Sequence, residues 1–225
     1  MNSLATILPF SAPRVRQPRR ALRPLPWTDG LYARVFEDIL DGRFVEGLSE
    51  DLLIRTYDAG RSEVRRVVTR LTRQQIIHAR PNQRAHVAEP DAEQIRQVLQ
   101  ARRMAEGTVI QLLCASTDAS AINSLQALIA RERESVEVSR QNTAIRLGGE
   151  FHLQLARIAG NAPMVHFLEG LIPLTGLALA ARSVMHDQGW QIRQAILDAI
   201  QGGNALQGIE EMTRYLQQLE TLTAG

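Results

Sequence analysis

Arginine side chains are concentrated between Ala59 and His86, where seven arginines accompany a single acidic residue, Glu63. A guanidinium group keeps its charge at physiological pH and offers its N–H donors in a planar fork. It therefore binds phosphate groups, and it can form paired hydrogen bonds with O6 and N7 of guanine. A surface that only supports a fold does not need this density of charge. We expect the segment to contact a polyanion such as DNA.

Three short helices are expected to position these arginines. Apolar residues recur at helical spacing over residues 31–40, and Gly42 can end that helix. Ser49 is placed as an N-cap before two acidic residues and starts a second helix, which ends at residues 58–60. Ser62 can then cap a third helix with valine and leucine inward and arginine on its other faces. This pattern is typical of a helix-turn-helix, whose second helix enters the major groove.

A short hairpin is expected directly after the third helix. Residues 75–79 and 84–88 tolerate β structure and flank Pro81-Asn82, which predicts a wing beside the DNA. Glu89-Pro90-Asp91 closes this module, because proline resists extension of a strand and an aspartate can cap a helix. We therefore predict a winged helix-turn-helix domain over residues 31–90. The wing would carry Arg80, Arg84 and His86 on or near its tip.

Residues 91–225 predict a second, all-α domain. Apolar residues return at helical spacing in six successive segments, without strand-period segments or internal repeats, so we expect an antiparallel bundle. The expected fold class is therefore mainly α with one small β-hairpin. No Ser-His-Asp order, glycine-rich phosphate loop, CxxC or HExxH motif stands out, and His186 beside Asp187 is too common a pair to indicate a catalytic dyad. We do not expect an enzyme.

Residues 1–30 hold five prolines and five arginines, which indicates an extended basic arm. Two interpretations remain open: a disordered tail, or an arm that touches phosphates or a minor groove. Residues 1–90 carry 15 arginines and 10 acidic residues, whereas residues 91–225 carry 11 arginines and 14 acidic residues. Only the first part therefore suits a polyanion.

The overall composition excludes a disordered, collagen-like or disulfide-rich chain, since 44% of the 225 residues are hydrophobic and there is one cysteine, Cys114. A lone cysteine favours a reducing compartment, so we expect a cytoplasmic protein. No apolar run of about 18 residues occurs, because Pro173 interrupts the longest stretch, residues 171–181; no membrane-spanning helix is expected. The short apolar segment 4–10 precedes the arginines, unlike the order in a signal peptide.

Four stretches of the chain match the motifs of one known family. They are Gly47-Leu48-Ser49-Glu50 with Leu52-Leu53, residues 59–65 (AGRSEVR, similar to "VSRTPVR"), residues 99–106 (LQARRMAE), and Phe151-His152-Leu153-Gln154-Leu155 followed by Ala159-Gly160-Asn161 (similar to "FHxxL…AGN"). By the order and spacing of these stretches, the chain resembles GntR-family transcriptional regulators of the FadR type, which carry an FCD effector-binding domain. The resemblance spans about residues 31–222. It implies an N-terminal winged helix, followed over residues 91–225 by an all-α domain for effector binding and dimerisation.

The resemblance implies specific contacts with double-stranded operator DNA. Arg61 and Arg65 are expected to touch phosphates and bases, and Ser62 to cap its helix or reach a phosphate. Arg66 and Arg84 are added to this set. Three departures from the family pattern, at Asp51, at Ala59-Gly60 and at Gln83-Arg84, predict an operator different from the family's commoner ones.

The second domain departs further from the family. Many FCD domains bind a divalent metal through an aspartate four residues before the motif histidine and through two later histidines. Here Gly148, Arg193 and Tyr215 occupy those three positions, and only His152 remains. We therefore expect no metal and no cofactor. His152 could be a satisfied polar group, an effector partner or a metal ligand, and Gly148-Gly149 suggests opened space or a bend, since glycine weakens a helix.

Arg193 could replace the positive charge of the metal and pair with an anionic effector such as an organic acid. The expected effector site consists of Arg102, His152, Arg193 and Tyr215, although Arg102 could instead form a helix pair with Glu106. The expected function is a homodimeric regulator, in most such proteins a repressor, whose affinity for a near-palindromic operator changes on binding a carboxylate. The alternative is a constitutive DNA-binding protein with a degenerate effector site. A third hypothesis, a helical enzyme, is supported by no set of candidate catalytic residues in the sequence.

Overall fold

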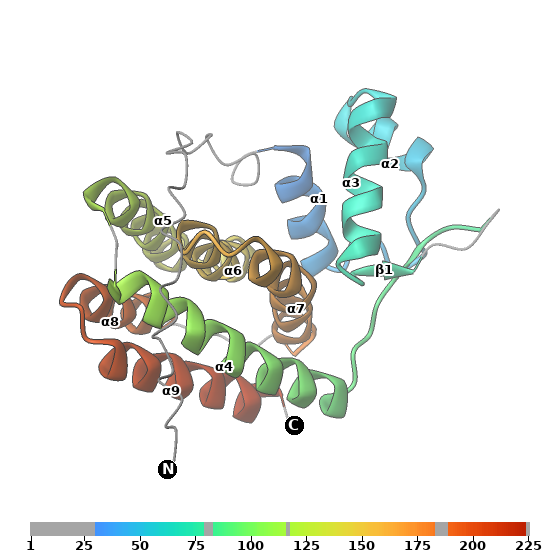
Figure 1. Ribbon diagram of the computed structural model, residues 1–225. Helices are drawn as coiled ribbons and strands as arrows, with labels where there is room; N and C mark the ends of the chain where they lie inside the picture. The colour runs from blue at the N-terminus through green and yellow to red at the C-terminus, as the bar shows by residue number, and fades with distance from the viewer. Residues whose placement is uncertain (1–29, 79–82, 116–117, 183–188, 224–225) are drawn as a thin grey trace, which may run out of the picture.

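The computed structural model describes residues 30–78, 83–115, 118–182 and 189–223, which form two units in contact (Figure 1). The first unit contains helices α1 (Leu31–Leu40), α2 (Glu50–Tyr57) and α3 (Arg61–Arg73) and strands β1 (Ile77–His78) and β2 (His86–Val87). The second contains α4 (Ala92–Ala115), α5 (Ala119–Glu137), α6 (Gln141–Ile158), α7 (Ala162–Ala181), α8 (Gly189–Gln201) and α9 (Ala205–Thr223). The expected fold class is confirmed.

Local capping explains where the helices of the first unit begin and end. The Ser49 hydroxyl accepts a hydrogen bond from the Leu52 backbone N–H at 3.2 Å, which confirms the predicted N-cap. Asp58 ends α2 in the left-handed region, at φ 48° and ψ 48°. The predicted cap of α3 is wrong: the N-cap is Gly60, with no side-chain hydrogen bond, and Ser62 lies inside the first turn. Glycine reaches the extended N-cap conformation readily, so the helix starts earlier.

The predicted hairpin is present. β1 and β2 pair antiparallel, with Ile77 opposite Val87, and Leu48 forms an isolated bridge with Ala85. That bridge brings the loop before α2 against the hairpin, and Gly47 makes the approach possible. Gly47 has φ +88°, and a Cβ atom there would lie 3.0 Å from the Ala85 carbonyl oxygen. Arg80 and the predicted turn, Pro81-Asn82, lie outside the described residues.

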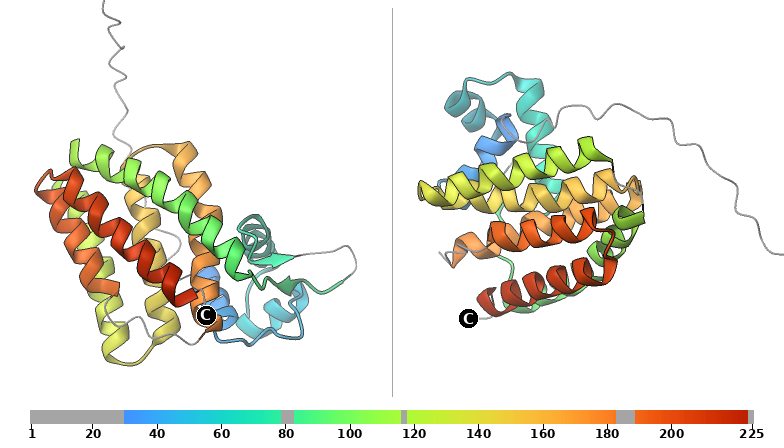
Figure 2. Two further views of the ribbon diagram at one scale, coloured as in Figure 1. Left: turned by 90° about the horizontal axis from the view of Figure 1, so that it is seen from below. Right: turned by 90° about the vertical axis from the view of Figure 1, so that its left-hand side faces the viewer.

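Six helices of the second unit form a closed ring (Figure 2). Each contacts the next in the order α5, α6, α7, α4, α9, α8 and back to α5. Leu99, Ile110, Phe151 and Leu216 are among the fully buried side chains at its centre. Because every helix turns one apolar face inward, polar side chains carried on those faces meet near the ring axis.

Helix α7 is long and apolar enough to cross a membrane by length and composition alone, with a mean hydropathy of 1.6. Its place in the ring, between α4 and α6, accounts for that composition, because the core helix of a folded domain passes the same test. The helix ends at Ala181, and residues 183–188 lie outside the described part of the chain.

Helix α1 connects the two units. It contacts α3 on one side and α6 and α7 on the other. Leu174 and Leu177 of α7 join the apolar core of the first unit, and Glu37 of α1 pairs with Arg146 of α6 at 2.6 Å. A shared core and an ion pair that is mostly shielded from water hold the units together, so a change in α6 or α7 reaches α1 directly.

Candidate DNA-binding surface and effector cavity

Helix α3 exposes all its arginines except the half-buried Arg70, because Val64, Val67 and Leu71 bury its opposite face. Arg61 and Arg65 are exposed on the first two turns, together with Ser62. No side chain caps the N-terminus of α3. Backbone N–H groups at an uncapped helix N-terminus attract phosphate, so this end suits a DNA backbone as well as base edges.

Of the predicted DNA contacts, Arg65 and Arg84 are exposed and accessible, whereas Arg66 lies on another side of α3. Arg65 is 3.7 Å from Glu50, but its side chain is 72% exposed, so the pair is weak and leaves the guanidinium accessible. Arg84 is exposed next to the loop before α2, with its Nη1 donating to the Glu46 carbonyl at 3.5 Å. Arg66 instead lines a groove that faces the helical unit.

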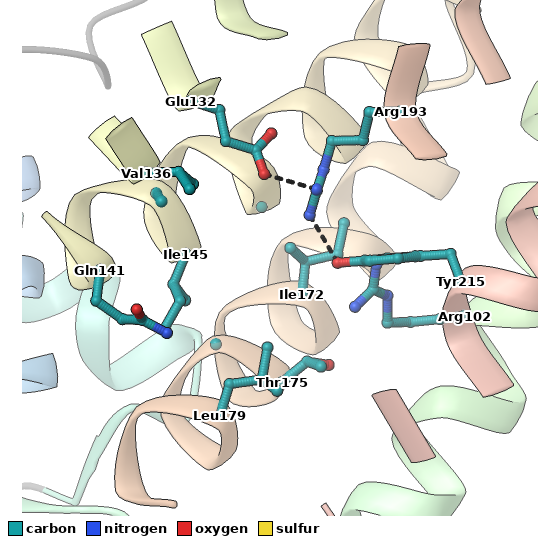
Figure 3. A pocket seen from close by; sticks show the side chains of 13 residues that line it. Arg102, Glu132, Val136, Gln141, Ile145, Ile172, Thr175, Leu179, Arg193 and Tyr215 are labelled. Atoms are coloured by element: carbon teal, nitrogen blue, oxygen red, sulfur yellow. Dashed lines mark hydrogen bonds and ion pairs between the residues drawn. The ribbon is translucent and has the colours of Figure 1, made fainter. Parts of the chain in front are cut away.

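A small cavity lies inside the ring of helices, and all six helices contribute side chains to it (Figure 3). Arg102, Arg193 and Tyr215 line it, together with Glu132 from α5. Aliphatic residues and the polar side chains of Gln141 and Thr175 complete the walls. Its volume is about 40 Å³, which is room for about three water molecules. The structure therefore brings three of the four predicted effector-site residues to one cavity; the fourth, His152, stacks on the Tyr215 ring with the centroids 4.8 Å apart.

The Arg193 guanidinium is held by groups of the protein itself. Its Nη1 donates to the Glu132 carboxylate at 2.7 Å, its Nη2 to the Tyr215 hydroxyl at 2.8 Å, and its Nε to the Gly148 carbonyl at 3.4 Å. Glu132 thus supplies the carboxylate that an effector was expected to bring. Burial raises the pKa of Glu132, while Arg193 opposes that shift.

Gly148 is required by this arrangement. A Cβ atom at residue 148 would lie 2.7 Å from Cζ of Arg193 and closer still to Nη2. The expected opened space is therefore absent at Gly148, because the guanidinium fills the space that a side chain would take, whereas Gly149 does line the cavity. Glycine and arginine at these two positions depend on each other sterically.

Replacing Gly148 by alanine is expected to lower the free energy of unfolding by about 1–3 kcal/mol, because the new methyl group must displace a buried ion pair. Gly107→Ala in α4 is the matched control, since a Cβ atom there meets nothing within 4 Å, and it should leave stability unchanged or raise it. Urea unfolding measures both. Equal stability of the two variants would show that Arg193 does not occupy this position.

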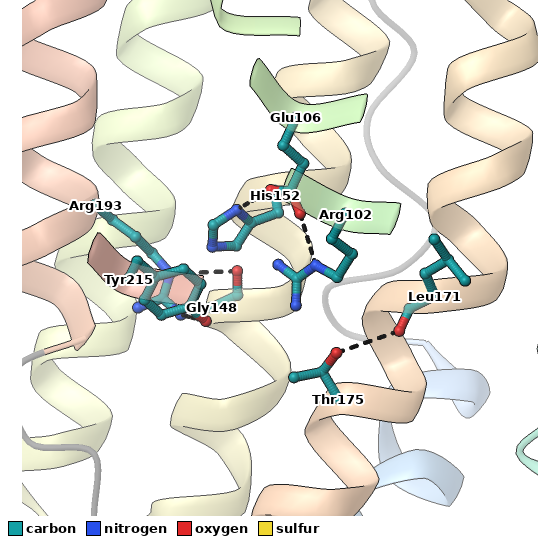
Figure 4. Close-up of polar contacts among 8 residues, drawn as sticks. All are labelled: Arg102, Glu106, Gly148, His152, Leu171, Thr175, Arg193 and Tyr215. Carbon is teal, nitrogen blue, oxygen red and sulfur yellow. Dashed lines mark hydrogen bonds and ion pairs between the residues drawn. The ribbon is translucent and has the colours of Figure 1, made fainter. Parts of the chain in front are cut away.

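A second buried network joins α4 to α6 (Figure 4). Glu106 accepts from Nε of Arg102 at 2.6 Å and from Nδ1 of His152 at 2.6 Å. All three side chains are at most 2% exposed. Burial would raise the pKa of Glu106, but Arg102 and His152 hold it down at about 2, and burial lowers the pKa of His152 to about 4 despite Glu106. His152 is therefore neutral, with its proton on Nδ1.

The low pKa of His152 predicts a pH-dependent stability. As pH falls from about 6.5 towards 4, the unfolded chain binds a proton at this residue that the folded chain does not, so the free energy of unfolding decreases, by up to about 1.4 kcal/mol per pH unit. His152→Asn keeps a donor for Glu106 but cannot titrate, so it should flatten this slope. His86→Asn, at an exposed histidine, should not. Identical slopes for wild type and His152→Asn would contradict the assignment.

The centre of the ring does not fit a divalent metal. Within the described residues no group of three histidine, cysteine, aspartate or glutamate side chains is placed to hold one. The Nε2 atom of His152 is buried without a hydrogen-bond partner among the described residues, but its ring stacks on Tyr215, whose hydroxyl accepts from the Arg193 guanidinium. A fixed positive charge repels a cation, so these residues do not suit a divalent metal.

Glu132 was not among the predicted site residues. It lies in a run of charges, Arg131 to Glu134, that resembles a solvated helix face. Its position in the helical repeat could have identified it. Glu132 follows the buried Ile129 by three residues and Leu128 by four, which places it on the inward face of α5.

Comparisons with known proteins agree with this architecture. The FCD domain matches residues 97–218. Among solved structures, E. coli McbR/YncC superposes with a TM-score of 0.68 at 16% identity, covering 84% of this chain and 92% of that chain. A putative GntR transcriptional regulator from Rhodococcus sp. RHA1 gives a TM-score of 0.68 at 20% identity, with 85% and 94% covered. At these low sequence identities, the two superpositions show that the fold is shared.

No curated protein matches the sequence. The FCD match covers more than half of the chain, from α4 into α9, and so includes every helix that lines the cavity. The proteins of the FCD-domain family are transcriptional regulators and not enzymes. The chain belongs to the FCD-domain family of transcriptional regulators, with the domain order of the GntR type.

Proposed function

We propose that this regulator binds a specific, near-palindromic operator as a homodimer in the cytoplasm and represses transcription from it. The observation that carries the proposal is the exposed, uncapped N-terminal end of α3, where Arg61 and Arg65 flank Ser62. A helix of this kind beside a wing can enter the major groove, and a two-fold dimer would place two such helices in successive half-sites. Residues 31–90 would read the DNA, and residues 91–225 would provide dimer contacts and effector binding.

Selection of bound duplexes from a random pool tests this proposal. We expect enrichment of one sequence with two inverted half-sites centred about one or more helical turns apart. Enrichment of a single, unrepeated half-site would contradict the dimeric arrangement. Binding without any enriched sequence would contradict sequence-specific regulation.

We further propose that a small organic acid acts as effector without a metal. Arg102 supports this. It lines the cavity and interacts with Glu106 and Tyr215, but its buried Nη2 atom has no hydrogen-bond partner among the described residues. An unpaired, buried guanidinium N–H favours a bound acceptor such as a carboxylate oxygen. The ligand would have to be small, or the surrounding side chains would have to move.

A constitutive DNA-binding protein with a degenerate effector site is the second candidate. The pairing of Arg193 with Glu132 and the small volume of the cavity favour it. Thermal unfolding with acetate, propionate, lactate and succinate separates the two. An effector at a hundred times its Kd stabilises by about 2.7 kcal/mol, and Tyr215→Phe, which removes one polar group from the cavity, should reduce that gain. No stabilisation by any acid would favour the constitutive protein.

A further inference from the structure

A second, larger hollow lies between the two units, apart from the cavity in the ring. α3 forms one side of this interdomain groove and the first half of α7 forms the other. Its volume is about 770 Å³, within the range of about 300–1,000 Å³ typical of ligand sites. By the same measure the cavity in the ring has about 40 Å³. Of these two, only the interdomain groove has the size of a metabolite-binding site as the structure stands.

One wall of the interdomain groove is basic. Arg66, Arg70 and Arg73 are four and three residues apart, so they lie on one face of α3. Arg73 Nη2 is 3.2 Å from Nδ1 of His166, on α7 across the groove. An arginine can only donate, so His166 accepts there. Arg70 lies over the Tyr32 ring, 3.4 Å from its centroid.

Acidic residues do not cancel this charge. Glu63 and Glu169 also line the groove, but Glu169 is paired with Arg157, 3.3 Å away. The lining therefore keeps an excess of positive charge, and Arg66 and Arg73 are exposed at its surface. Such a wall attracts an anionic group.

Apolar side chains line much of the groove opposite α3, beside His166 and Glu169. Phe167 is 49% exposed although it is a large hydrophobic residue, and Leu171, Leu174 and Val98 continue the surface beside it. An exposed aromatic ring next to aliphatic side chains, rimmed by charge, marks a surface that gains from being covered. A single ligand in the groove could therefore contact basic and apolar side chains at the same time.

We propose that the interdomain groove binds an amphiphilic organic anion, with its carboxylate or phosphate on Arg66 and Arg73 and its apolar body against Phe167. A ligand seated there contacts the recognition helix α3 and the effector-domain helix α7 at once. It would fix the position of α3 relative to the ring. A ligand in the cavity at the ring axis cannot do this by direct contact, because α3 does not line that cavity.

Calorimetric titration with decanoate and with octyl phosphate tests the proposal on the full chain. Both should bind, whereas decanol and inorganic phosphate should bind at least about tenfold more weakly, because each lacks one half of the required chemistry. Arg73→Gln and Phe167→Ala should each weaken decanoate binding at least about fivefold. Arg214→Gln and Leu206→Ala, at exposed positions on α9, are matched controls and should not.

Three results would overturn the assignment. Equal binding of decanol and decanoate would indicate an apolar surface without anion recognition. An equal loss of decanoate affinity in the groove variants and in the α9 controls would show that the ligand binds elsewhere. Binding of decanoate that is unchanged by both Arg73→Gln and Phe167→Ala would exclude the groove. Binding of the selected operator by these variants is measured separately, so a failure here is distinguishable from a failure of DNA recognition.

Discussion

Replacing Arg61 and Arg65 together by alanine is expected to weaken binding to the selected operator at least about a hundredfold. Both side chains are exposed at the N-terminal end of α3, the part of a recognition helix that reaches base edges. A bidentate contact to guanine contributes about 1–3 kcal/mol, and each lost phosphate contact also reduces affinity. Fluorescence anisotropy with a labelled duplex measures the loss.

Controls separate reading of bases from general charge. Arg133→Ala, at an exposed arginine on α5, removes one positive charge far from α3 and should change affinity less than about threefold. In each single variant, loss of a phosphate contact should lower both the affinity for every sequence and its salt dependence, whereas loss of a base contact should relax specificity at one position. An operator affinity that survives the double substitution would place DNA recognition on another surface.

Replacing Glu106 by alanine is expected to lower the free energy of unfolding by about 3–5 kcal/mol. Its carboxylate is the common acceptor of Arg102 and His152, and the substitution leaves the Arg102 charge buried without a counter-ion. This is a large fraction of the total stability of a typical domain. Urea unfolding at pH 7 measures the effect.

The chain contains a matched control for this prediction. Arg133 and Glu137 form an ion pair with the same spacing of four residues, at 2.8 Å, but both side chains are 58% exposed. Glu137→Ala should therefore cost less than about 0.5 kcal/mol. The double variant Arg102→Met/Glu106→Leu should recover much of the stability lost in Glu106→Ala, because it removes both charges. Equal effects of Glu106→Ala and Glu137→Ala would contradict the burial of the network.

The elements of the fold could be predicted where the signal lies within one segment. Ser49 precedes two acidic residues and caps α2 as expected, and Asp91 accepts from the Gln94 backbone N–H at 2.7 Å at the start of α4. Ser62 failed as a cap because Gly60, two residues earlier, already takes the extended conformation that an N-cap needs. Local patterns place a helix well but do not decide between two starting residues this close together.

The site could be predicted only in part, because its contacts join different helices. The pair Arg102–Glu106 lies within one helix, and its spacing of four residues indicates it directly. The contacts of Arg193 with Glu132 and Gly148 depend on α8 lying beside α5 and α6 in the ring. Periodicity gives the inward face of each helix but not its neighbours. The resemblance to the family therefore indicated Arg193 as a positive charge of the site, without showing that the protein itself neutralises it.

Methylation interference at guanine N7 is the most direct test of the central claim, that the arginines of α3 read the major groove. The selected operator is treated with dimethyl sulfate, and bound and free duplexes are separated and mapped. Duplexes methylated at guanines of either half-site are expected to be depleted from the bound fraction, because N7 is the acceptor that arginine uses in the major groove. Recovery of these methylated duplexes at the same frequency in the bound and free fractions would contradict it.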